Sequence, residues 1–73
     1  MIMMTLERFV ELRLSHAMNS VRRDEQTLQR DMALGAVLYA SASANSFNEG
    51  TKIYNWYQKE IELKFNKILY GVE

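Results

Sequence analysis

The chain contains no cysteine and no proline, and only three of its 73 residues are glycine. Without cysteine it can form neither a disulfide framework nor a thiolate zinc site, and this composition fits the cytoplasm. Without proline, and with so few glycines, long helices meet no obstacle. The sequence therefore favours a helical protein that no disulfide or thiolate metal site holds together.

An excess of one charge and a long apolar run are also missing. Nine Lys and Arg residues balance nine Asp and Glu residues, so no net charge draws the chain toward nucleic acid or an anionic membrane. The longest uncharged stretch begins at Met32, is rich in Ser and Asn, and is shorter than a membrane span. Residues 1–4 lack the charged start of a signal peptide. We expect a soluble cytoplasmic protein without a membrane partner, and the balanced charge disfavours nucleic acid as a partner.

The short length limits the size of the hydrophobic core. Chains of this length bury only roughly 60% of their unfolded surface, and oligomerisation is a common remedy for the marginal core that results. We therefore expect residues 1–73 to form a single all-α domain, which completes a bundle with a partner or with a second copy.

A first long helix is predicted over about residues 5–44. Thr5 is a candidate N-cap, and Met4 and Phe9 have the spacing of a hydrophobic staple across it. Apolar residues then recur at threes and fours, which is typical of one helical stripe. Polar residues within 19–27 could cap a new helix, but no glycine or proline forces a break there, so we favour a continuous or gently bent helix.

A second helix is predicted over about residues 47–70, after a polar hinge at residues 45–50. Ser46 and Glu49 in the hinge have the spacing of a capping box. Gly71 is well placed as the C′ residue. The two helices would fold back on each other as an antiparallel helical hairpin.

One stripe on each helix is expected to close this hairpin. Small residues on the first helix would face bulky ones on the second, and Gly35 would leave room for an aromatic ring that crosses it. The predicted hairpin core consists of Leu14, Val21, Leu28, Met32, Gly35, Ala36, Tyr57, Ile61, Phe65 and Ile68.

Each helix also carries apolar residues on a second face. Trp56, Leu63 and Tyr70 follow a seven-residue repeat away from the hairpin stripe, and Leu34 and Val37 point away from the stripe of the first helix. Isolated exposed apolar residues, a homodimeric four-helix bundle, or a different protein partner would each explain this pattern. We favour a second, protein-binding interface on this face.

Nothing in the sequence indicates catalysis, a metal site or a cofactor. His16 is the only histidine, and the sequence contains no Glu-x-x-His pair, no glycine-rich phosphate loop and no nucleophile elbow. The cluster "RRDEQTLQR" mixes both charge signs at helical spacing, which is typical of a solvated face. We therefore expect a binding protein and not an enzyme.

Three stretches, "TLERFVELRLSHA", "RRDEQTLQRDM" and "YNWYQKEIELKFNKILYGV", give the chain a layout that resembles the small E-type co-chaperones of bacterial type III secretion needle subunits. The resemblance implies a cytoplasmic helical hairpin that binds and stabilises a tetratricopeptide-like chaperone, which in turn holds the needle subunit. Trp56, Leu63 and Tyr70 would then anchor the partner, and Leu34 and Val37 would extend that surface. The alternative is a homodimeric helical regulator of phage or plasmid type that binds a host protein or DNA.

Overall fold

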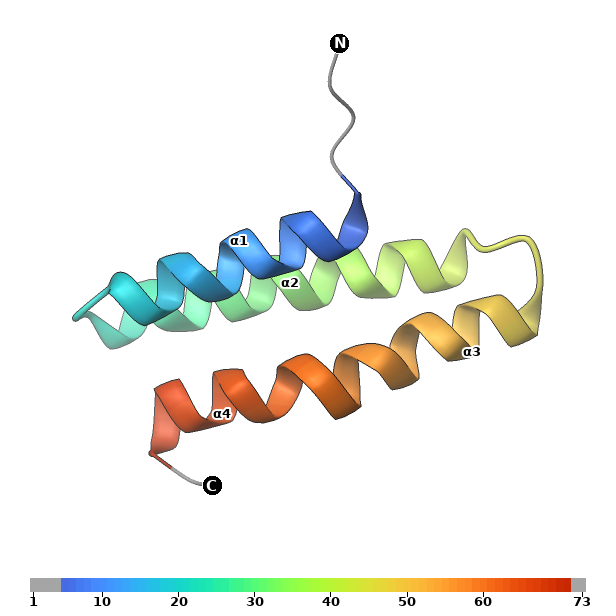
Figure 1. Ribbon diagram of the computed structural model, residues 1–73. Coiled ribbons are helices and arrows are strands. Elements are labelled where there is room, and N and C mark those ends of the chain that lie inside the picture. Colours follow the sequence, from blue (N-terminus) through green and yellow to red (C-terminus); the bar gives the residue numbers. More distant parts are fainter. Residues whose placement is uncertain (1–4, 72–73) are drawn as a thin grey trace, which may run out of the picture.

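The computed structural model describes residues 5–71, and all regular secondary structure in that range is helical. The helices are α1 (Leu6–Asn19), α2 (Arg23–Ala42) and a longer third helix. This third helix consists of α3 (Phe47–Trp56), a π-helical segment η1 (Tyr57–Glu62) and α4 (Leu63–Tyr70). In Figure 1, α1 and α2 run side by side in opposite directions, and the third helix lies across from them. The all-α prediction is confirmed, but residues 5–71 form three packed helices and not the two of a simple hairpin.

The predicted first helix is interrupted. Because α1 ends at Asn19 and α2 begins at Arg23, the prediction of a continuous or gently bent helix over residues 5–44 is wrong. The break falls within residues 19–27, where polar residues could cap a new helix. Most of the stability of a helix in a protein comes from packing one face against other elements. Folding back lets α1 bury its apolar face on α2, whereas a continuous rod would leave much of that face in water.

Polar side chains stabilise the break between α1 and α2. The Ser20 hydroxyl accepts a hydrogen bond from the backbone N–H of Arg22 at 3.3 Å, and the Gln26 side-chain amide donates to the Ser20 carbonyl at 2.9 Å. Arg22 also pairs with Asp24 at 2.6 Å. Side chains that satisfy the backbone locally in this way compete with continued helix, so the chain turns here without glycine or proline.

The predicted caps at the other helix ends are present. The Thr5 hydroxyl accepts a hydrogen bond from the backbone N–H three residues further on at 3.2 Å, and the Ser46 hydroxyl accepts one from Glu49 at 3.2 Å. Gly71 has the left-handed conformation, with φ 67°, that ends a helix at little cost when the residue is glycine. These N-caps and the C-terminal glycine are confirmed; Met4 of the expected hydrophobic staple lies outside the described residues.

The π-helical segment η1 keeps the third helix aligned with the core. Apolar residues recur at every fourth position of this helix, at Ile53, Tyr57, Ile61, Phe65 and Leu69. An α-helix turns about 100° per residue, so a spacing of four drifts by about 40° at each step. A π-turn holds more residues than an α-turn, and η1 therefore compensates for the drift. The last four of these residues are all buried.

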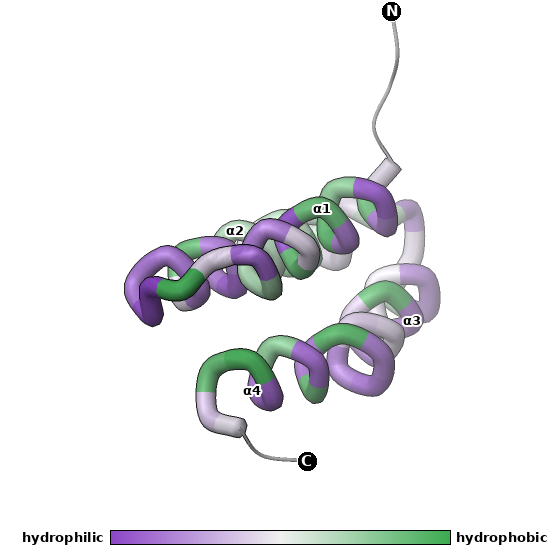
Figure 2. Tube along the Cα trace, turned by 60° about the vertical axis from the view of Figure 1, so that its left-hand side comes forward, coloured by the Kyte–Doolittle hydropathy of each residue, from purple (hydrophilic) through white to green (hydrophobic). Residues whose placement is uncertain are grey.

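The core lies where the three helices meet, and Figure 2 shows hydrophobic and hydrophilic residues alternating along each of them. Leu34, Trp56 and Ile68 pack against the core from its edge. The buried apolar residues are Val10, Leu14, Ala17, Ala33, Val37, Tyr57, Ile61, Phe65 and Leu69.

Candidate protein-binding site

Helix α2 exposes most of its larger apolar side chains and buries smaller ones. Its buried positions are Gln29, Ala33 and Val37, one polar and two small residues. Leu28 is 50% exposed and Tyr39 is 75% exposed. An amphipathic helix that served only its own chain would turn its largest apolar residues inward. The outward face of α2 is therefore the strongest candidate for a binding surface.

We define the α2 outer stripe as Leu28, Met32, Gly35 and Tyr39. These residues are spaced by four, three and four, so they lie on one side of the helix over about three turns. Each of them is exposed. Contiguous apolar surface of this kind marks interaction sites in proteins that otherwise bury such residues.

The glycine of the stripe is unexplained by the chain's own packing. A methyl group added at Gly35 would meet no atom within 4 Å, whereas one added at Gly50 would stand 2.5 Å from the carbonyl oxygen of Ser41. Gly50 is thus required by the close approach of α3 to α2, where Ser41 also donates a hydrogen bond to the Gly50 carbonyl at 2.7 Å. Gly35 costs α2 about 1 kcal/mol relative to alanine and gains nothing within the fold. A partner that approaches α2 closely would account for it.

The stripe continues into a shallow groove between α2 and the start of α1. The groove has a volume of ≈ 300 Å³. Leu6 and Phe9 of α1 line one side of it, and Ala36, Tyr39 and Ala40 of α2 line the other. The two alanines leave room beside Tyr39 for a bulky side chain of a partner.

Four residues predicted for the hairpin core lie on the surface. Val21 is 98% exposed at the break between the helices, and Leu28, Met32 and Gly35 belong to the α2 outer stripe. The sequence pattern identifies this stripe correctly but assigns it to the wrong side. The reason is that α2 has two apolar faces, and the one with small residues packs more closely against two neighbouring helices.

The other predicted core residues face inward. Ala36 is half-buried, and Ile68 is half-buried against the edge of the core. The buried members of the predicted set are Leu14, Tyr57, Ile61 and Phe65.

The five predicted partner-binding residues do not form one surface. Val37 is fully buried, so the prediction that it extends a binding surface is wrong. Leu34 and Trp56 are half-buried against the core, whereas Leu63 is 63% exposed and Tyr70 is 55% exposed. Residues spaced by seven, such as Trp56 and Leu63, lie on the same face only if the α-helix between them is regular. The wide turn of η1 rotates the two residues apart.

Tyr70 already contacts α2 within the chain. The Arg23 guanidinium carbon lies 5.3 Å from the centre of the Tyr70 ring, and Arg30 donates a hydrogen bond to the Tyr70 hydroxyl at 3.5 Å. These contacts hold the end of α4 beside the start of α2. Tyr70 therefore contributes to packing within the chain. Of the five predicted partner-binding residues, Leu63 is the most exposed.

The described residues contain no arrangement suited to catalysis by a metal. No group of three or more His, Cys, Asp or Glu side chains within residues 5–71 could hold a metal ion, and His16 is exposed. The side chain of Tyr57 is enclosed by the core. Burial, and after it the Glu62 carboxylate, raises the pKa of Tyr57 to about 12. Burial keeps this phenol away from substrates, so it offers no reactive group at the surface.

The function of this chain is inferred from its surface geometry, because similarity to known proteins offers no guide. No protein-family model, curated protein or solved structure matches the chain. Within residues 5–71, no helix combines the length and the apolar character needed to cross a membrane.

Proposed function

We propose that this chain is a protein-interaction module that docks on a helical partner through the α2 outer stripe. The observation that carries the proposal is the inverted polarity of α2, which buries Gln29 and Ala33 and exposes Leu28 and Tyr39. Buried aromatic residues commonly dominate binding energies at interfaces. Tyr39 would therefore be the main anchor, and Gly35 would let the partner's backbone approach.

In its narrower form, the proposal is a type III secretion co-chaperone that binds and stabilises the chaperone of a needle subunit. The resemblance of residues 5–17, 22–32 and 54–72 to that family supports it. A tetratricopeptide-like chaperone presents stacked helix pairs, and an apolar stripe centred on a glycine suits docking against such helices. A homodimeric bundle would use the same stripe against a second copy.

Tyr39→Glu tests which partner occupies the stripe. The variant should keep the helicity and melting temperature of the wild type, because Tyr39 is 75% exposed. Its affinity for the partner should fall by about 30-fold, because placing a charge in an apolar interface removes an anchor. Val21→Glu, at a position 98% exposed and outside the stripe, is the matched control.

The measurement is light scattering over a concentration series, with the chain alone and with the needle-subunit chaperone encoded in the same genome. A complex with that chaperone that Tyr39→Glu weakens by about 30-fold and Val21→Glu leaves unchanged would support the co-chaperone. Self-association lost in Tyr39→Glu alone would support the homodimer and reject the co-chaperone. A chain that stays monomeric in both experiments would overturn the proposal.

Gly35→Ala separates a docking role from a folding role. Alanine should raise the free energy of unfolding by about 1 kcal/mol, because it favours helix and finds open space. The same substitution should weaken binding, because the added methyl keeps the partner at a distance. Gly50→Ala is the control and should destabilise the fold, since its methyl would collide with the Ser41 carbonyl. A Gly35→Ala chain that is stabilised and binds with undiminished affinity would contradict close docking at this face.

A further inference from the structure

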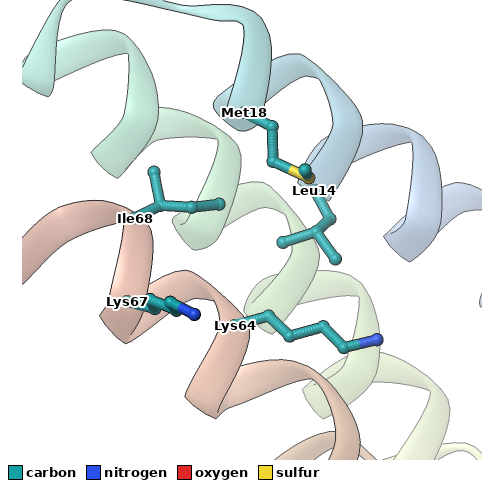
Figure 3. A pocket seen from close by; sticks show the side chains of 5 residues that line it. All are labelled: Leu14, Met18, Lys64, Lys67 and Ile68. Carbon is teal, nitrogen blue, oxygen red and sulfur yellow. The ribbon is translucent and has the colours of Figure 1, made fainter. Parts of the chain in front are cut away.

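A second apolar groove lies between α1 and α4, away from the α2 outer stripe. It has a volume of ≈ 510 Å³. Figure 3 shows its lining side chains, two from α1 and three from α4. We call it the α1–α4 groove, and its lining residues are Leu14, Met18, Lys64, Lys67 and Ile68.

The groove exists because α1 packs chiefly on α2 and touches α4 much less. Leu14 is almost buried and forms part of the floor, and Ile68 is half-buried beside it. Met18 is 67% exposed at the rim. Two helices with an open apolar channel between them present the shape that receives a third helix, which buries its own apolar face there.

Charge distinguishes one side of the groove from the other. Lys64 and Lys67 both come from α4 and are both exposed. The side-chain ion pairs within residues 5–71 are formed by arginines at the start of α2 and within it, so neither lysine is paired there. Residues spaced by three are neighbours on a helix surface, and the two ammonium groups therefore form one basic edge along the apolar floor.

We propose that the α1–α4 groove binds an amphipathic helix of another protein, one whose apolar stripe carries carboxylates along one edge. Leucine-like side chains of that helix would cover Leu14, Met18 and Ile68. Asp or Glu residues spaced by three or four would face Lys64 and Lys67. Because this groove shares no residue with the α2 outer stripe, the chain could hold two proteins at once.

The test uses two synthetic helical peptides, each about 18 residues long, which is five turns of helix. Both carry the same leucine stripe; one has glutamates along one edge and the other has lysines in their place. The full chain is labelled with ¹³C at its methionine methyl groups. Met18 then reports on the α1–α4 groove and Met32 on the α2 outer stripe.

The glutamate peptide should shift the Met18 resonance and leave that of Met32 in place, and the lysine peptide should bind at least about tenfold more weakly. The double variant Lys64→Glu/Lys67→Glu should reverse this preference. Both lysines are exposed, so circular dichroism should show an unchanged fold. Met18→Gln should weaken binding of the glutamate peptide, whereas Val21→Gln, fully exposed outside the groove, should not.

Three outcomes would overturn the inference. They are equal binding of both peptides, a shift of Met32 without Met18, and the absence of any shift when peptide is in large excess. A shift of Met32 alone would place the peptide on the α2 outer stripe instead of in the groove. None of the three outcomes contradicts the loss of binding expected for Tyr39→Glu, so the two proposals can fail separately.

Discussion

The hydroxyl group of Tyr57 is a buried polar group of the core that makes no hydrogen bond within residues 5–71. The side chain of Tyr57 is only 1% exposed. A buried polar group left in this way costs free energy, because water satisfied it in the unfolded chain. The ring itself is needed, since Tyr57 is among the largest fully buried side chains.

Tyr57→Phe should therefore stabilise the protein. The substitution keeps the ring and removes the hydroxyl, and we expect the free energy of unfolding to rise by about 1 kcal/mol near neutral pH. Urea unfolding measures it. The gain should be accompanied by a change in alkaline stability, because burial, and after it the Glu62 carboxylate, raises the pKa of Tyr57 from 10.0 to about 12.

The direction of this pH dependence of stability follows from the number of protons that the native and unfolded states bind. Between pH 10 and about 12 the native state keeps the Tyr57 proton that the unfolded chain releases, so stability falls as pH rises through this range. Tyr57→Phe should show a shallower fall there. Equal slopes for Tyr57→Phe and the wild type would show that this phenol does not control the alkaline limb.

At the scale of elements, the π-helical segment η1 and the break between α1 and α2 decide which faces meet. Neither is caused by a glycine or a proline. Both follow from packing: η1 keeps a four-residue apolar spacing on one side of the third helix, and the break brings α1 back onto α2. A helix adopts such local departures from regular geometry when the packing gained exceeds the hydrogen-bond strain.

Deleting Lys59 should convert η1 into ordinary α-helix without unfolding the protein. Lys59 is exposed in the middle of η1, and its loss brings Tyr57 and Ile61 to a spacing of three. In a regular α-helix the five residues spaced by four, Ile53, Tyr57, Ile61, Phe65 and Leu69, would then lie within about 80° of one another. We expect the free energy of unfolding, measured by urea titration, to change by no more than about 1 kcal/mol.

Deleting Asp31 is the control for this experiment. Asp31 is also exposed but lies in the regular helix α2, so its loss rotates Gln29 by about 100° relative to Ala33 and Val37. That deletion should cost about 3 kcal/mol or more. If both deletions lower the free energy of unfolding by comparable amounts, η1 does not contain one residue more than the packing of the third helix requires.

For the whole molecule, the distribution of large and small apolar residues on α2 predicts an unusual order of mutational effects. Val37→Ala should cost about 2 kcal/mol, because Val37 is fully buried and its loss leaves a cavity. Leu28→Ala removes more carbon atoms but should cost less than about 0.5 kcal/mol, because Leu28 is 50% exposed.

Urea unfolding at low protein concentration measures both α2 variants in the absence of association. A larger cost for Leu28→Ala would place the α2 outer stripe inside the fold and would remove the basis of the proposed function. If the chain self-associates through that stripe, the cost of Leu28→Ala should grow with concentration.

Much of the secondary structure could be predicted because its signals are local. Thr5, Ser46 and Gly71 each satisfy backbone groups within a few residues of themselves, so the sequence alone determined where those helix ends would fall. The burial of Tyr57, Ile61 and Phe65 was also predictable, because bulky apolar residues that form one stripe of a helix are normally buried in the core.

Only the tertiary structure decided which face of α2 lies inside. Two apolar faces of one helix are equivalent to a periodicity argument, and the choice depends on how closely α1 and the third helix can approach Ala33 and Val37. The same long-range packing set the break after Asn19 and the wide turn in η1. The sequence by itself determined an all-helical chain with an apolar surface to spare; the packing of three helices determined that this surface is the α2 outer stripe.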